Sequence, residues 1–157
     1  MRSKIRRILL SIGKYAIVDT EDYNKVGHLK WYFSEGYAVR SIRVNGKKMT
    51  IMMHRVLLDA PPHSMIDHAN RDGLDNRRCN LRFCNKAQNS WNSAVIRGAS
   101  GYKGVYYWKD RNKWVAHIRT NNVSKTIGYF KSAVEAARAY NEVVKKYRGE
   151  FAYINPI

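Results

Sequence analysis

The segment IDHANRDGLDNRRCNLRFCNKAQN, from Ile66 to Asn89, concentrates acids in a chain that has few of them. The chain has 12 Asp and Glu residues against 29 Lys and Arg residues. Even so, Asp67, Asp72 and Asp75 fall within this segment, beside His68 and among arginines and asparagines. The mixture indicates a chemical site, and the simpler alternative is a polar turn with solvated arginines.

The residues in and around this segment predict a short strand, a long turn and a helix. The apolar MID at 65–67 reads as the end of a strand, and the polar stretch 69–80 is rich in turn residues. Asp72 and Asp75 are able to close Asx turns there. The stretch NKAQNSWNSA that follows reads as a helix with Asn85 as its N-cap. Asn85, Asn89 and Asn92 would then share one face.

Asp67 and His68 are neighbours at the predicted strand end. Successive strand residues point to opposite faces, so both can be buried only if the strand ends there. A carboxylate oxygen and an asparagine carbonyl oxygen are hard ligands that suit Mg²⁺, Mn²⁺ or Ca²⁺. A neutral histidine can take a proton from an attacking water near physiological pH. The pattern therefore favours metal-assisted phosphate chemistry, with Asp67 and Asn89 as ligands and His68 as the base.

The order of these residues resembles the HNH endonucleases with the ββα-metal fold, especially those of phages and mobile introns. The resemblance rests on His54-Arg55, on Asp67 to Asn70, on Asp75 to Arg82 and on Gln88-Asn89, and covers roughly 54–92. It implies that Asp67 and Asn89 hold a divalent metal, most commonly Mg²⁺ with Mn²⁺ able to substitute. It also implies that His68 is the general base and that Asn80 braces the loop and orients the histidine. The last motif position is asparagine, as in one branch of the family.

The number of cysteines indicates whether the chain could also hold a structural zinc ion. Cys79 and Cys84 are the only cysteines, and one such pair does not complete a zinc site. We therefore expect no structural zinc and no small-molecule cofactor.

Residues 1–60 form the first expected region, made of β-hairpins. The stretches 15–19, 31–44 and 47–58 are rich in β-branched and aromatic residues, which predicts strands. Asn45-Gly46 predicts a two-residue hairpin turn between the last two strands. Arg40 and Arg43 lie on this hairpin, where we expect them to extend a contact with DNA.

Residues 102–157 predict a three-stranded antiparallel sheet packed on one helix. The stretches GVYYW, WVAHIRT and KTIGYF read as strands. Ser132 and Glu135 form a capping box for the helix, and Gly149 is its C-cap. An apolar stripe that begins with alanines allows the helix to lie close to the sheet. Residues 94–101 are small and polar, and we interpret them as a linker.

This last region resembles the plant ethylene-response-factor type of DNA-binding domain. The resemblance rests on 102–105, 114–119, 128–130, 136–140 and 149–155, and spans nearly all of 101–155. It implies that the sheet reads DNA. The candidate contacts are Lys103, Tyr106, Trp108, His117, Arg119 and Lys125. Tyr106, Trp108 and His117 replace residues that are arginine or acid in the plant domains, so no plant target sequence is carried over.

The net charge of +17 and the pI near 10.1 indicate a polyanionic partner. The sequence lacks a signal-peptide core and any long apolar stretch, so we expect no membrane partner. A cytoplasmic location follows, in the host cell if the gene belongs to a phage or an intron.

The sequence thus predicts an α+β protein with an N-terminal β region at 1–60, an HNH module at 61–93, a linker at 94–101 and a DNA-binding domain at 102–157. We expect a metal-dependent endonuclease that cuts double-stranded DNA at a specific site, as a nicking monomer or a homodimer. Further candidate DNA contacts in the HNH module are Arg71, Arg77 and Arg82. The alternatives are a non-catalytic DNA-binding protein with a decayed HNH module and an RNA-binding protein.

Overall fold

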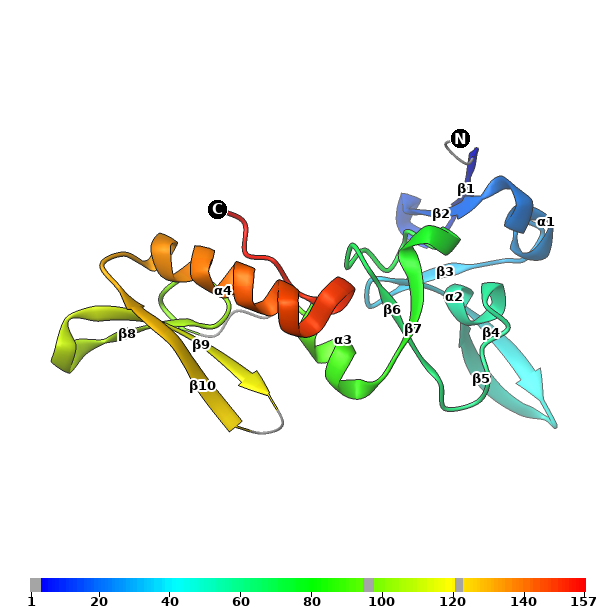
Figure 1. Cartoon of the computed structure of the whole chain (residues 1–157). Coiled ribbons are helices and arrows are strands. Elements are labelled where there is room, and N and C mark those ends of the chain that lie inside the picture. Colours follow the sequence, from blue (N-terminus) through cyan, green and yellow to red (C-terminus); the bar gives the residue numbers. More distant parts are fainter. Residues whose placement is uncertain (1–3, 95–97, 121–122) are drawn as a thin grey trace. The chain divides into compact units, whose positions relative to one another are not determined.

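A computed structural model of the chain describes residues 4–94, 98–120 and 123–157. The chain divides into two compact units, Met1–Lys86 and Ala87–Ile157. Helix α3 (Lys86–Asn92) begins at this boundary (Figure 1), and its existence confirms the predicted helix. The expected linker at 94–101 falls in part on residues 95–97, which lie outside the described residues.

The first unit contains three small antiparallel sheets. Strands β1 (Ile5–Leu9) and β2 (Tyr15–Asp19) form one hairpin, and β6 (Met65–His68) and β7 (Leu81–Cys84) form another. Between them in sequence lies the sheet of β3 (Tyr32–Ser34), β4 (Tyr37–Val44) and β5 (Lys47–Met52). The short helical elements are α1 (Tyr23–Val26), α2 (Met53–Leu57), η1 (Ser11–Gly13), η2 (Thr20–Asp22) and η3 (Arg78–Asn80).

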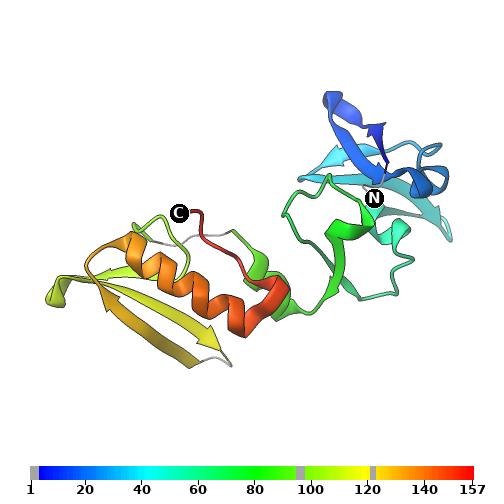
Figure 2. The same cartoon turned by 45° about the horizontal axis from the view of Figure 1, so that its top comes forward.

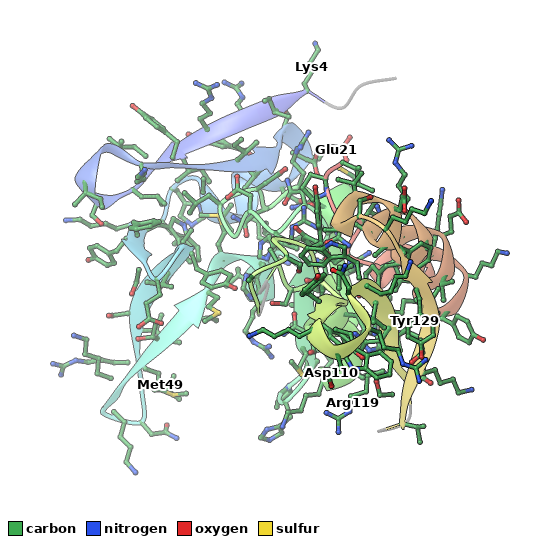
Figure 3. The ribbon with its side chains drawn as sticks, turned by 90° about the vertical axis from the view of Figure 1, so that its left-hand side faces the viewer. Lys4, Glu21, Met49, Asp110, Arg119 and Tyr129 are labelled. Carbon is green, nitrogen blue, oxygen red and sulfur yellow. The ribbon has the colours of Figure 1, made fainter. Side chains whose placement is uncertain are left out.

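The β4–β5 hairpin turns at Asn45 and Gly46, with φ angles of 51° and 77°. Two successive positive φ angles are those of a type I′ turn, so the predicted turn is confirmed. The hairpin extends to an exposed tip, near which Met49 is labelled in Figure 3. The core of the unit lies elsewhere, around Val18, Val26 and Leu57, which are fully buried.

Two strand predictions for the first unit were wrong in their extent. The stretch 31–44 is interrupted by a turn at Glu35 and Gly36, both with positive φ. The stretch 47–58 is a strand only to Met52, and continues as helix α2. Met53 and Leu57 are both buried, at the i, i+4 spacing that places side chains on one face of a helix. His54 consequently lies on a helix and is buried.

The second unit is a three-stranded antiparallel sheet with helix α4 (Ala133–Arg148) across one face, as predicted (Figure 2). The strands are β8 (Val105–Trp108), β9 (Lys113–Thr120) and β10 (Val123–Phe130), in the order β10-β9-β8. Short helices η4 (Lys109–Arg111) and η5 (Gly149–Phe151) follow β8 and α4. The buried core joins Val105, Ala116 and Ile118 of the sheet to Ala136, Ala137, Tyr140 and Val144 of the helix.

Both ends of α4 are capped at the predicted residues. The Ser132 hydroxyl accepts a hydrogen bond from the Glu135 backbone N–H at 3.2 Å, and the Glu135 carboxylate accepts one from the Lys131 N–H at 3.1 Å. The N–H of Gly149 bonds to the carbonyl of Lys145 at the other end. Among the described residues, no helix has the length and apolar character needed to cross a membrane.

The approach of α4 to the sheet depends on Gly104. A Cβ atom at this position would lie 2.0 Å from the Tyr140 ring, and the φ angle is +77°. Only glycine fits both conditions, which explains its place at the start of β8.

Candidate active site

Asp67 and His68 end strand β6, and both are buried, with exposed fractions of 7% and 5%. Consecutive strand residues point to opposite faces, so burial of both requires that the strand end there. This placement confirms the predicted strand end. It brings a carboxylate and an imidazole into the interior of the first unit.

Arg82 lies directly opposite Asp67 in the β6–β7 hairpin. Its Nε and Nη2 donate to Asp67 Oδ2 at 2.9 and 2.6 Å. The side chains of Arg82 and Asp67 are only 14% and 8% exposed, so the charge pair is largely shielded from water. A DNA phosphate or a metal ion at this position would have to share or displace this pair.

The loop between β6 and β7 is closed by Asp75. Its carboxylate accepts hydrogen bonds from Nε and Nη2 of Arg77 at 2.7 and 2.6 Å and from Nδ2 of Asn70 at 2.8 Å. The Arg77 guanidinium lowers the pKa of the Asp75 carboxyl. Arg77, a candidate DNA contact, is therefore engaged within the loop.

The predicted Asx turns are confirmed in the same loop. Asp72 Oδ1 accepts from the Leu74 N–H at 2.9 Å, and Asp75 Oδ1 accepts from the Arg77 N–H at 3.4 Å. Asn80 forms hydrogen bonds to the loop backbone through both its side-chain oxygen and its side-chain nitrogen. Its Oδ1 accepts from the Asn70 N–H at 2.9 Å, and its Nδ2 donates to the Asp75 carbonyl at 2.7 Å.

His68 lies among two other rings. The His54 and Tyr37 ring centroids are 5.0 and 5.8 Å from that of His68. Burial lowers the pKa of His68, against the opposing effects of the Asn76 side chain and the nearby acids Asp67, Asp72 and Asp75. Burial and the neighbouring His68 lower the pKa of His54 to about 4. Both imidazoles are therefore neutral at pH 7.

Sequence reasoning did not identify Tyr37 or Asn76 as neighbours of His68. Tyr37 belongs to β4, a different sheet, and no local pattern links it to the loop. A Cβ atom at Gly73 would lie 2.5 Å from the Gly36 carbonyl and 2.6 Å from the Tyr37 ring. The glycine in the loop was therefore a signal that another chain segment approaches closely there.

The N-terminal strands hold the loop in place. Backbone hydrogen bonds join Ile17 to Leu74 at 2.8 Å and Asn76 to Ile17 at 2.7 Å. Arg78 adds a bidentate ion pair with Asp22 at 2.8 and 2.7 Å, and its N–H donates to the buried Asp19. Asp19, Asp22 and Arg78 are structural residues that the sequence pattern did not reveal.

The donor set bears on which metal could bind. Within the ranges that the structure describes, no group of three or more His, Cys, Asp and Glu side chains is arranged to hold an ion. Asp67 is a single hard oxygen donor, and Asn89 is exposed on α3 in the second unit. A single carboxylate donor such as Asp67 is compatible with a hydrated Mg²⁺ ion, which keeps several water ligands.

The remaining cationic candidates in the first unit differ in exposure. The Arg40 guanidinium lies 5.8 Å from the Trp31 ring centroid, and Arg40 is half-buried. Arg43 is exposed opposite Lys48 on the β4–β5 hairpin. Arg71 is exposed in the loop, with a φ angle of 67°.

The sheet candidates of the second unit do not all share one face. Directly opposed residues in antiparallel strands project to the same side, so the register assigns each residue to a face. Tyr106, Trp108, His117 and Arg119 lie on the face away from α4. Lys125 is directly opposite the buried Ile118, so its side chain projects from the sheet face that α4 covers. Lys103 precedes β8, and its Nζ donates to the carbonyls of Ser90, Trp91 and Ser93.

Comparison with known proteins gives one distant relationship. The chain is 26% identical over 148 residues to the uncharacterized HNH endonuclease L560 of Acanthamoeba polyphaga mimivirus. The match covers 92% of this chain and 76% of that protein, so it extends across both units. No protein-family model matches the chain, and no solved structure matches it. The resemblance of the second unit to plant DNA-binding domains stays a prediction.

Proposed function

We propose that this protein is a metal-dependent DNA endonuclease of the HNH type that hydrolyses phosphodiester bonds. The observation that carries the proposal is the buried His68 imidazole beside the Asp67 carboxylate at the end of β6. The distant similarity to a mimivirus HNH endonuclease supports the same activity. The net charge of +17 supports a nucleic-acid substrate.

His68 would act as the general base. A neutral imidazole can accept a proton from the attacking water, and burial lowers the pKa of His68, which favours the neutral form. The contacts of Asn80 with the loop backbone would limit movement of the residues after His68. His54 and Tyr37 restrict the His68 ring from the other side.

Asp67 would hold a divalent cation, with Asn89 as the second ligand that the sequence motif predicts. A bound Mg²⁺ or Mn²⁺ ion supplies charge stabilisation at the phosphate and the leaving oxygen. Arg82 occupies Asp67 Oδ2, so a metal ion would have to share the carboxylate with Arg82 or displace Arg82 toward another anion. A DNA phosphate is the anion that a nuclease substrate provides.

The DNA-binding part of the proposal concerns duplex DNA. Arg40, Arg43 and Arg71 in the first unit and Arg119 in the second remain the candidate duplex contacts, and Tyr106, Trp108 and His117 remain candidate DNA contacts. A single active site cuts one strand, so a monomer would nick and a homodimer would be needed for concerted double-strand cleavage.

The test is cleavage of supercoiled DNA that carries a candidate target, with Mg²⁺, with Mn²⁺ and with EDTA. We expect a nicked or linear product that needs the metal and falls by about 10²–10⁴-fold in His68→Ala, the usual contribution of a general base. His28→Ala is the matched control because His28 is exposed, and it should cleave normally. Equal cleavage by His68→Ala and the unaltered protein would refute the assigned role.

A second candidate function is a non-catalytic DNA-binding protein. The Asp67–Arg82 ion pair favours it, because the pair already neutralises the carboxylate that a metal would need. Tight duplex binding without cleavage of a verified target, in every metal tested, would select this alternative. Nicking that is lost in His68→Ala would exclude it.

A further inference from the structure

The face of the second-unit sheet opposite α4 is aromatic. Tyr106 and Tyr129 are 45% and 52% exposed, and Figure 3 labels Tyr129 on β10 and Arg119 on β9. Trp108 lies on the same face, 5.8 Å from Tyr129 between ring centroids. The His117 ring lies 5.3 Å from that of Tyr106. Large rings thus cover the sheet face that α4 leaves uncovered.

The burial of Val115 concerns its two cross-strand neighbours, Tyr106 and Tyr129. Val115 is fully buried, although it belongs to the face away from α4 and not to the helix-side core. Its direct cross-strand partners are Tyr106 on β8 and Tyr129 on β10. Neighbouring strands are about 4.8 Å apart, so the backbones of Tyr106 and Tyr129 are about 10 Å apart, with Val115 on the strand between them. Val115 is therefore shielded by side chains of its own face, while Tyr106 and Tyr129 keep about half of their surface exposed.

The charge of this face suits an anionic chain. Its described residues include Lys113 and Arg119, and none of them is an acid. Arg111 lies over the Trp108 ring at 4.6 Å, so a further cation borders the aromatic group. Cations beside exposed ring faces are the combination that binds phosphates and bases of single strands.

A hollow adjoins this face at strand β8. The cavity has a volume of about 420 Å³ and is lined by Ala99, Ser100, Tyr106, Tyr107, Lys109 and Trp114. β8 is an edge strand of the sheet. Tyr107 and Trp114 pair on the helix side, and Tyr106 is the lining residue that the hollow shares with the aromatic face. Aromatic walls and one lysine at the rim suit a flat base with its attached phosphate.

We propose that this surface binds single-stranded DNA, with unpaired bases stacked on Tyr106 and Tyr129 and one base in the hollow beside β8. Bases in a duplex are already stacked on each other, so they cannot present their ring faces to these side chains. The inference rests on the proposal that the protein acts on DNA, but not on cleavage itself. A surface of this kind would hold strands that open or end at the cleavage site.

Binding in the presence of EDTA tests the inference without cleavage. A labelled dT12 oligonucleotide and a labelled 12-base-pair duplex are compared by fluorescence anisotropy at 50 and 200 mM salt. We expect dT12 to bind more tightly than the duplex at 200 mM salt, since stacking is less sensitive to salt than phosphate contacts. We also expect dT12 to quench tryptophan fluorescence.

Substitutions then separate stacking from folding. Tyr106→Leu and Tyr129→Leu keep apolar bulk but remove the ring, and each should weaken dT12 binding about 10-fold. Tyr106→Phe and Tyr129→Phe keep the ring and should bind as the unaltered protein does. Tyr147→Leu is the matched control because Tyr147 is 61% exposed on α4. Equal urea midpoints among these variants establish that folding is unchanged.

Three results would overturn the inference. They are duplex binding as tight as dT12 binding at 200 mM salt, leucine variants that bind dT12 normally, and tighter binding of an rU12 oligonucleotide. Loss of dT12 binding with normal cleavage would refute this inference alone. Normal dT12 binding with no cleavage of a verified target would refute the nuclease alone.

Discussion

The β6–β7 hairpin with its loop and the β8–β10 sheet use polar and aromatic groups in opposite ways. In the hairpin, Asp67, Asp75 and Asn80 are buried and hydrogen bonded to neighbours within the unit. On the sheet, Tyr106 and Tyr129 are about half exposed. The first region is fixed before any ligand arrives, which suits chemistry. The second presents its groups to solvent, which suits binding.

The difference implies that substitutions in the two regions should separate in stability assays. Removing a partner from a buried network leaves other polar groups unsatisfied. Removing an exposed ring leaves no such group. Loss of stability should therefore follow the hairpin, and loss of affinity should follow the sheet.

The largest effect on stability is expected from Asp75→Ala. The substitution leaves Arg77 and Asn70 without their shared acceptor. Asp75 is buried but the Arg77 side chain is 36% exposed, so the cost should lie at the lower end of the range of about 3–5 kcal/mol for breaking a fully buried pair. The free energy of unfolding is measured by urea denaturation, followed by circular dichroism and tryptophan fluorescence.

Asp72→Ala is the control for the same loop. Asp72 is exposed and accepts a single described side-chain bond from the Leu74 N–H, so its loss should cost about 1 kcal/mol. Equal losses in the two variants would show that the Asp75 network does not set the stability of the loop.

The elements that sequence predicted well are those with local causes. The Asn45-Gly46 turn needs only positive φ angles, and the α4 helix needs only its caps at Ser132 and Gly149 and its apolar stripe. The same holds for the Asx turns at Asp72 and Asp75. Each of these features is fixed within a few residues of the signal.

The elements that sequence missed depend on contacts between distant segments. A loop of about a dozen residues does not fix the register of β6 against β7, so the Asp67–Arg82 pair could not be foreseen. Helix α2 is too short for a periodic signal, and its burial of His54 comes from the surrounding sheets. In the sequence, Arg78 reads as an ordinary arginine in a turn. Its partners Asp19 and Asp22 lie 59 and 56 residues away in the chain.

The next effect concerns pH and His54. The pKa of His54 in the folded protein is about 4, below its ordinary value near 6.5. Between pH 4 and 6.5, His54 therefore binds a proton in the unfolded chain but not in the folded chain. Stability from neutral His54 is present above pH 6.5 and is lost as the pH falls toward 4, by about 3 kcal/mol. His54→Phe, which keeps a ring beside Tyr37 and His68, should flatten the pH dependence of unfolding.

The lowered pKa of His68 adds to the same slope, so His54→Phe should remove only part of it. His28→Ala provides the baseline for an exposed histidine. If unfolding curves of His54→Phe and the unaltered protein shift equally between pH 6.5 and 4, His54 is not neutral in the folded state.

The smallest effect on stability is expected from Lys103→Met. This substitution tests whether Lys103, which precedes β8, contacts DNA or only stabilises helix α3. The Lys103 ammonium donates to three carbonyls at the end of helix α3, at 3.2, 2.9 and 2.5 Å, and methionine keeps its apolar stem. Losing a cation at a helix C-terminus should cost about 1 kcal/mol of stability. Duplex affinity should change little, whereas Arg119→Ala should weaken it, because Arg119 is exposed on the open face. A loss of affinity in Lys103→Met as large as in Arg119→Ala, with unchanged stability, would make Lys103 a DNA contact after all.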